Sequence, residues 1–178
     1  MRYIALLRAV NVGGRTLKMD RLRELFEAMK LRNVETFIAS GNVIFETAAS
    51  AASLEARIEK HLAQSLDFAV PTLVRSAPDF AALATHAPFA PRPSVAKAGA
   101  LYVGFLKSSP TAESVTRVRA LGGAGSEFEL HGRELYWRVE DRRAVLQISI
   151  TKFEKALGCT ATFRNVTTVT RIAERYCL

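Results

Sequence analysis

The sequence predicts an α+β protein made of two ferredoxin-like β-α-β-β-α-β halves in tandem, followed by an extra C-terminal helix. Three observations predict this fold. Apolar strand-like runs alternate with segments in which apolar residues recur every third or fourth position, turn residues separate neighbouring strands, and the same order of elements occurs twice. We expect the first half at residues 1–76, a helical and proline-rich connector at 77–98, and the second half with its appended helix at 99–178.

The first half begins with an apolar strand over residues 3–10 that ends in an Asn-x-Gly-Gly turn. A helix over about residues 20–30 follows, because apolar residues recur at i, i+3, i+4 and i+7 behind Asp20, its expected N-cap. The remaining elements are a hairpin with strands at 35–39 and 43–45, a helix with leucine or isoleucine at every fourth position from 54 to 66, and a strand at 70–74.

A short helix around Phe80 and Leu83 and the proline-rich run 88–93 form the connector. The second half repeats the order of the first. Its expected elements are a strand at 101–106, a helix that starts at Ser109-Pro110 and stops at Gly122-Gly123, a hairpin with strands at 128–130 and 135–139, a helix from the capping box at Thr151 to Gly158, a strand at 160–163, and a final helix capped by Asn165.

The strands at 3–10 and 43–45 are apolar at consecutive positions. A sheet with helices on one face and water on the other should instead alternate between apolar and polar residues. The second face of this sheet is therefore expected to be covered, either by the second sheet or by a partner subunit in a homo-oligomer.

Composition places the chain among ordinary globular proteins, with 49% apolar and 24% charged residues among 178. No apolar run approaches the roughly 18 residues of a membrane span, and the first residues lack the build of a signal peptide, so we expect a cytoplasmic protein that does not enter the membrane. Two cysteines without Cys-x-x-Cys spacing and three scattered histidines give no pattern of metal ligands. We therefore expect no metal and no cofactor.

The formal net charge of +8 is concentrated near the C-terminus, where residues 142–178 hold seven basic and two acidic side chains. A concentrated positive field attracts phosphate-bearing or otherwise anionic partners. Charge that serves only solubility is the alternative explanation.

The main candidate site consists of Asn11, Gly13 and Gly14 at the end of the first strand and Ser40 and Asn42 in the hairpin turn. In a ferredoxin-like sheet the first and third strands are adjacent and antiparallel, so these two turns should converge. Glycine main chain, Asn amides and a Ser hydroxyl at one rim would then supply neutral donors for an anion. In the competing interpretation, the glycines serve turn geometry and the polar side chains bond to their own turns.

Basic side chains are expected to close on this ligand, with Arg8, Arg15 and Arg164 as candidates. Arg8 shares a strand face with buried residues, which favours either a structural salt bridge or a ligand contact. A second candidate cluster contains Lys152, Lys155, Arg164 and Asn165, with Asn165 at a helix start where main-chain amides attract anions. An ordinary helix cap with solvated charges is its alternative.

Three motifs also carry a family resemblance: residues 5–14 (ALLRAVNVGG), 40–45 (SGNVIF) and 163–169 (FRNVTTV). The chain resembles the bacterial domain-of-unknown-function family 1697, whose pattern reads approximately ALLRGINVGG, SGNV and RNWNTV. Ala9 stands where that family usually has glycine, and Val166-Thr167 replace Trp-Asn. The family has no established activity, so the resemblance implies a fold and candidate positions but no reaction. If the replaced Trp or Asn contacts a ligand in relatives, this protein binds differently or not at all.

Two other classes of function remain open. RNA-recognition domains share the element order, and residues 101–106 resemble their first-strand motif, with Tyr136 or Trp137 on the partner strand. Tyr102 would then stack a base, although the basic-Gly-aromatic partner motif is missing and Tyr136 and Trp137 point to opposite faces. An enzyme is the third class, without an acid, base and nucleophile paired by spacing. A small anionic molecule is thus the expected partner, with RNA as the alternative.

Overall fold

The structure is a computed structural model, which describes residues 1–11, 16–90, 99–123, 125–141 and 149–178. The chain divides into two compact units: unit 1 contains residues 1–83 and 172–178, and unit 2 contains residues 84–171. Most of the short helix expected in the connector groups with the first half, and so do the last seven residues. The remainder of the expected connector includes residues 91–98, which lie outside the described residues.

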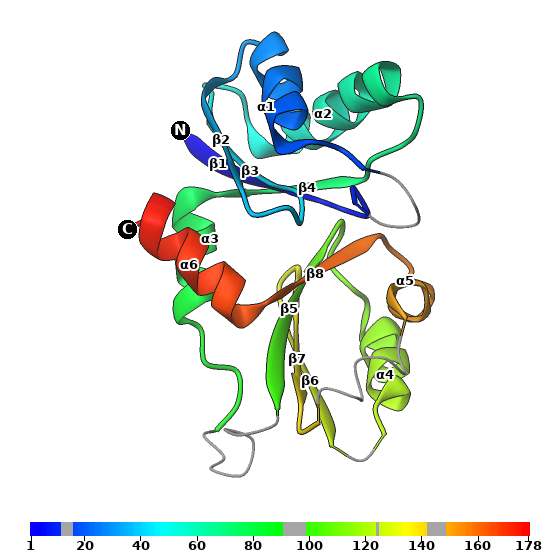
Figure 1. The fold of residues 1–178 in the computed structure, drawn as a ribbon. Coiled ribbons are helices and arrows are strands. Elements are labelled where there is room, and N and C mark those ends of the chain that lie inside the picture. Colours follow the sequence, from blue (N-terminus) through cyan, green and yellow to red (C-terminus); the bar gives the residue numbers. More distant parts are fainter. Residues whose placement is uncertain (12–15, 91–98, 124, 142–148) are drawn as a thin grey trace. The chain divides into compact units, whose positions relative to one another are not determined.

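Unit 1 contains one antiparallel sheet with the strand order β2-β3-β1-β4. Two helices, α1 and α2, cover one face of this sheet (Figure 1). The predicted β-α-β-β-α-β order is confirmed by its elements, which are β1 (Arg2–Leu7), α1 (Met19–Ala28), β2 (Arg32–Phe37), β3 (Asn42–Glu46), α2 (Ala51–Leu66) and β4 (Thr72–Ser76), followed by α3 (Ala77–Thr85).

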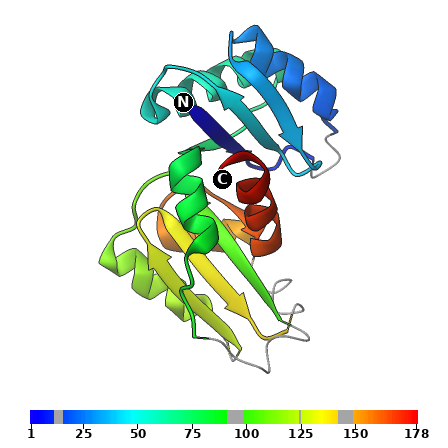
Figure 2. The same ribbon diagram turned by 90° about the vertical axis from the view of Figure 1, so that its left-hand side faces the viewer.

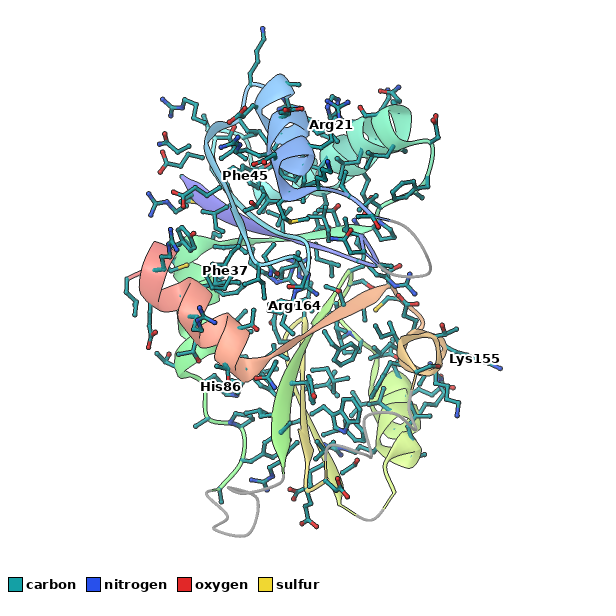
Figure 3. The ribbon with its side chains drawn as sticks, viewed as in Figure 1. Arg21, Phe37, Phe45, His86, Lys155 and Arg164 are labelled. Atoms are coloured by element: carbon teal, nitrogen blue, oxygen red, sulfur yellow. The ribbon has the colours of Figure 1, made fainter. Side chains whose placement is uncertain are left out.

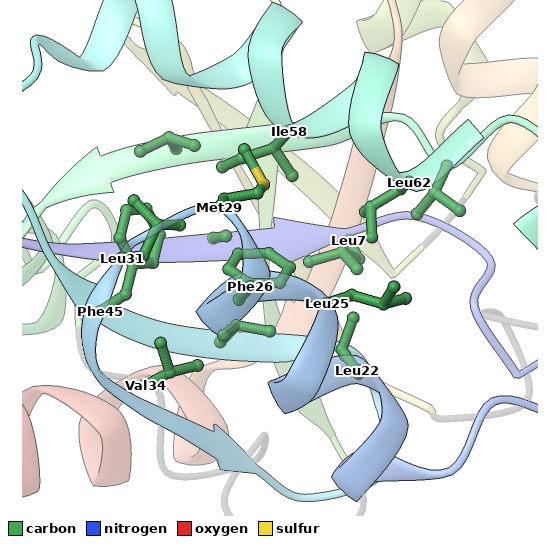
Figure 4. Packing of buried hydrophobic residues seen from close by; sticks show 14 of the residues in the cluster. Leu7, Leu22, Leu25, Phe26, Met29, Leu31, Val34, Phe45, Ile58 and Leu62 are labelled. Atoms are coloured by element: carbon green, nitrogen blue, oxygen red, sulfur yellow. The ribbon is translucent and has the colours of Figure 1, made fainter. Parts of the chain in front are cut away.

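The core of unit 1 lies between the sheet and these two helices. Phe26 of α1 packs against Phe45 of β3, with ring centroids 5.7 Å apart, and Ile58 of α2 belongs to the same cluster (Figure 4). The predicted helical faces therefore point into the core, because positions three and four apart share one side of a helix.

The opposite face of this sheet is also buried, as the consecutive apolar residues predicted. Leu6 and Leu7 point to opposite faces, and both are at most 1% exposed. Within unit 1, part of this cover comes from the end of α6 (Val166–Tyr176), where the ring of Tyr176 meets Phe37 edge-on at 6.1 Å. Figures 1 and 2 show α3 on the same side of the sheet, opposite α1 and α2. The part of this face that Tyr176 contacts needs no second sheet or partner subunit to cover it.

Unit 2 repeats the arrangement with the strand order β6-β7-β5-β8. Helices α4 and α5 pack on one face around Trp137 and Phe153, whose rings are 5.0 Å apart. The described elements are β5 (Ala100–Leu106), α4 (Ala112–Leu121), β6 (Ser126–His131), β7 (Glu134–Val139), α5 (Ile150–Leu157) and β8 (Ala161–Asn165), from which α6 continues.

The two halves match in detail at one end of each sheet. The main-chain N–H of Leu7, the last residue of β1, donates to the carbonyl of Gly41 at 2.8 Å. In unit 2, the N–H of Leu106, the last residue of β5, donates to the carbonyl of Arg133 at 2.9 Å. Each acceptor lies in the hairpin turn that joins the next two strands, so the first strand of each half ends beside that turn.

Three helices begin at a different residue from the predicted cap. The observed N-caps are Lys18 where Asp20 was predicted, Thr111 where Ser109 was predicted, and Ser149 where Thr151 was predicted. Thr111 and Ser149 each accept a hydrogen bond from the main-chain N–H three residues later. Neighbouring Ser and Thr residues are equally suited to this role, so the residue types alone did not select the observed one.

Candidate functional site

The candidate site of unit 1 lies where the chain leaves β1 beside the turn between β2 and β3. We call residues 8–11 and 38–42 the rim. The side-chain amide of Asn11 donates to the carbonyl of Ala39 at 2.9 Å, and Leu7 bonds to Gly41 next to it. The predicted convergence of the two turns is thus confirmed.

Asn11 also forms a hydrogen bond with a residue further along the chain. Its Oδ1 atom accepts a hydrogen bond from the main-chain N–H of Leu17 at 2.7 Å. This hydrogen bond joins the two residues on either side of the segment 12–16. Three predicted site residues within that segment, Gly13, Gly14 and Arg15, lie outside the described residues.

The Asn42 side chain is directed into its own turn. The residue is fully buried, and Nδ2 donates to the carbonyl of Phe37 at 3.0 Å and to Oγ of Ser40 at 2.9 Å. Ser40 itself is exposed. The amide hydrogens of Asn42 therefore maintain turn geometry, as the competing interpretation of the sequence stated.

Two of the five described non-glycine residues with positive φ lie at the rim. Ala9 has a φ of +57° and Ile38 a φ of +50°, both in the left-handed region that non-glycine residues avoid. Ile38 is β-branched, which makes its conformation more unusual, and its side chain is 45% exposed. Sequence reasoning missed Ile38, because no residue type before a Ser-Gly-Asn turn indicates such a conformation. Ala9, in contrast, occupies a position where the resembling family usually has glycine.

Arg8 supplies the positive charge of the rim. The residue is half-buried directly after β1, and its main-chain N–H donates to the carbonyl of Pro71 at 2.8 Å. Sequence reasoning did not single out Arg75, a buried cation of unit 1. Arg75 is buried on β4, where it donates to the carbonyl of Val74 at 3.0 Å and lies 3.8 Å from the carboxylate of Glu55.

The second predicted cluster belongs to unit 2, and the structure does not bring its cations together. Lys152 is exposed on α5, whereas Arg164 is buried on β8. Phe163 packs against Phe153 of α5, with ring centroids 4.8 Å apart, so the next residue of the strand, Arg164, points to the opposite face of the sheet. Figure 3 labels Arg164 and, on α5, Lys155.

The Arg164 guanidinium is bonded within its own strand. Nη1 donates to Oγ1 of Thr162 and to the carbonyl of Phe163, each at 2.9 Å, and burial lowers the pKa of Arg164 to about 10. Asn165 acts as the predicted cap, since its Oδ1 atom accepts from the N–H of Thr167 at 2.9 Å. In these described contacts, both residues have structural roles.

The three aromatic residues considered for base stacking do not form an exposed platform. Tyr136 and Trp137 are both buried, and Tyr102 is partly buried against Trp137, with ring centroids 5.6 Å apart. The Tyr102 ring thus packs on the helix-covered face of the sheet.

In the described part of the chain, His, Cys, Asp and Glu side chains form no group of three or more that could hold a metal ion. Within the same residues, no helix is both long enough and apolar enough to cross a membrane.

The comparisons with known proteins agree with this description. The model of the family described as "Protein of unknown function (DUF1697)" matches residues 1–136, and the chain belongs to this family. A search of curated proteins found no match. Among solved structures, the conserved bacterial protein SP0830 from Streptococcus pneumoniae is similar, with a TM-score of 0.75 and 22% identity over 97% of each chain. That likeness supports the fold alone.

The family match covers one of the two candidate clusters and ends before the other. The matched region, residues 1–136, contains the whole rim, whereas Lys152, Arg164 and Asn165 lie after its end.

Proposed function

We propose that the protein binds a small anionic, phosphate-like molecule at the rim of unit 1. The observation that carries this proposal is the junction of the two turns, where the Asn11 side chain bonds to the carbonyl of Ala39 beside the cation Arg8. A basic side chain held at a polar junction of two turns is a suitable receptor for an anion.

The residues of the rim divide into two roles. Asn11 and Asn42 are positioning residues, because their side-chain amides bond to the main chain of the turns. The ligand contacts are assigned to the guanidinium of Arg8 and to the hydroxyl of Ser40, an exposed residue. A guanidinium suits this role because its planar N–H groups match the oxygens of phosphate and carboxylate.

The strained residues support the same location. A left-handed conformation costs an alanine or isoleucine about 1–2 kcal/mol, and such strain persists at functional sites more often than elsewhere. Ala9 and Ile38 lie on the two turns that Asn11 joins. The exposed Ile38 side chain would give the ligand an apolar contact beside its charged group.

We also propose a cytoplasmic location. The support is that Cys159 and Cys177 are both free and form no disulfide.

A thermal-shift series at constant ionic strength tests the rim, with inorganic phosphate, glycerol 3-phosphate, ATP and citrate as probes. A true ligand raises the free energy of unfolding by about 2.7 kcal/mol at a hundredfold excess over Kd. Arg8→Gln and Ser40→Ala should remove most of this increment while the free proteins still unfold cooperatively.

The matched control is Arg32→Gln, which removes one exposed arginine at the other end of β2. This variant should keep the full ligand increment. If none of the four probes stabilises the wild type, or if Arg8→Gln and Arg32→Gln keep equal increments, the rim is structural and the proposal is wrong.

A further inference from the structure

Unit 1 contains an open pocket of about 260 Å³ that shares no lining residue with the rim. Its wall is the outer side of α2 together with Met29, the residue at the C-terminal end of α1. The lining side chains are mainly basic or amide-bearing: Met29, Arg57, Lys60, His61 and Gln64.

Helical spacing explains why these side chains meet. Residues 57, 60, 61 and 64 are three, four and seven positions apart, so they form one row along α2. The buried row of the same helix, formed by Leu54, Ile58 and Leu62, packs into the core beside it. The pocket is therefore a direct consequence of the amphipathic pattern of α2.

The acidic residues of α2 are directed elsewhere. Helix α2 contains two carboxylates, and both accept main-chain hydrogen bonds from β4: Glu59 from Thr72 at 2.8 Å and Glu55 from Val74 at 2.9 Å. No carboxylate occurs among the described residues that line the pocket. The positive charges of Arg57 and Lys60 are thus not neutralised within the pocket wall.

Two of the lining groups have features that suit a ligand. Nη2 of Arg57 donates to the carbonyl of Met29 at 2.6 Å, which fixes the guanidinium at the wall and leaves its other N–H groups as donors. Nε2 of His61 is buried without a hydrogen-bond partner among the described residues. An anionic oxygen satisfies this nitrogen when Nε2 carries the proton and the imidazole ring turns to face the pocket, because an unprotonated Nε2 is an acceptor.

We propose that this pocket binds a small phosphate monoester, with Arg57 and Lys60 contacting the phosphate and His61 and Gln64 its neighbouring oxygens. The volume lies slightly below the range of roughly 300–1,000 Å³ for pockets that hold drug-sized ligands, which suits a small ester better than a dinucleotide. The proposal does not depend on the rim, because the two sites share no residue.

Residue-resolved NMR tests the pocket with glycerol 3-phosphate as the probe, inorganic phosphate and citrate as comparison arms, and sodium chloride to hold the ionic strength constant. Saturable shifts in the amides of residues 57–64 and in the Gln64 side chain are expected. Lys60→Gln should raise Kd about tenfold, the effect of losing one charge-assisted hydrogen bond, without changing the stability of the free protein. Lys60 is exposed, so this variant does not disturb the core.

The matched control is Arg21→Gln, which removes an exposed arginine in the first turn of α1, at the opposite end of that helix from Met29 (Figure 3). Its Kd should equal that of the wild type. Linear, non-saturating shifts with every probe, or an equal change of Kd in both variants, would overturn the proposal. Shifts confined to residues 38–42 would support the rim and exclude the pocket, which keeps the two proposals separable.

Discussion

The left-handed backbone conformation of Ala9 can be tested with a single substitution. Its left-handed backbone, with a φ of +57°, carries a cost that glycine avoids. Ala9→Gly should therefore raise the free energy of unfolding by about 0.5–1 kcal/mol. Glycine removes the backbone strain, but its greater conformational freedom in the unfolded chain offsets part of this gain. Urea denaturation measures this difference.

The same substitution in a helix is the control. Ala63 is exposed within α2, where Ala63→Gly should lower the free energy of unfolding by about 1 kcal/mol. Opposite signs for the two variants are expected. If Ala9→Gly destabilises the protein as much as Ala63→Gly does, residue 9 is not left-handed in solution.

The residues of the rim also show what can be predicted at this scale. Asn11 and Asn42 could be selected from their places beside glycine turns, but a side-chain amide can face a ligand or its own main chain, and residue type does not decide between them. The position of Ala9 was marked by its departure from the family pattern. The left-handed conformation of Ile38 occurs next to Ala39, whose carbonyl accepts the long-range hydrogen bond from Asn11, and no local pattern in the sequence indicates that bond.

At the scale of elements, both halves protect the first N–H of their fourth strand in the same way. Glu59 of α2 accepts from Thr72, the first residue of β4, and Glu154 of α5 accepts from Ala161, the first residue of β8, at 3.0 Å. These strands lie at sheet edges, where unpaired main-chain groups would otherwise recruit another strand.

Glu154→Ala tests this role. The N–H of Ala161 would lose its acceptor, and the free energy of unfolding should fall by about 1–2 kcal/mol. Glu113→Ala is the control, because Glu113 forms an exposed ion pair with Arg117 on α4 that should contribute at most about 0.5 kcal/mol. Chemical denaturation measures the free energy of unfolding of both variants. If the two variants lose equal amounts of stability, the Glu154 contact has no special role.

The order of the elements could be predicted because apolar periodicity is strong in each of them, as the row Leu54, Ile58 and Leu62 shows. Their ends were less predictable. The strand was predicted to continue to Val10, but β1 ends at Leu7. Ala9, which lies between Leu7 and Val10, has a left-handed rather than an extended backbone conformation. Local pattern thus fixes the type of an element better than its boundary.

At the scale of the whole molecule, the last turns of α6 complete unit 1. Nη1 of Arg2 donates to the carbonyl of Tyr176 at 2.9 Å, and the hydroxyl of Tyr176 donates to Glu35 at 3.1 Å. Arg2 and Glu35 are 174 and 141 positions away in the sequence. No local pattern indicates contacts of this range, which explains why the sequence assigned the final helix to the second half.

Tyr176→Ala should lower the free energy of unfolding by about 3 kcal/mol, because it removes a buried ring that packs on Phe37. Tyr176→Phe, which keeps the ring and loses one hydrogen bond, should cost about 1 kcal/mol. Hydrogen exchange should show the larger loss of protection in β2 of unit 1 for Tyr176→Ala. Unchanged protection in β2 would contradict the assignment of this helix end to unit 1.

The division of α6 also determines the order in which the chain can fold during translation. Residues 1–83 leave the ribosome first, yet their unit also contains residues 172–178, which are made after all of unit 2. The sheet face that receives Tyr176 therefore stays without this part of its cover while the ribosome synthesises the intervening residues. Unit 2 is continuous in sequence and can finish folding first, so the first half to be translated is the last to be completed.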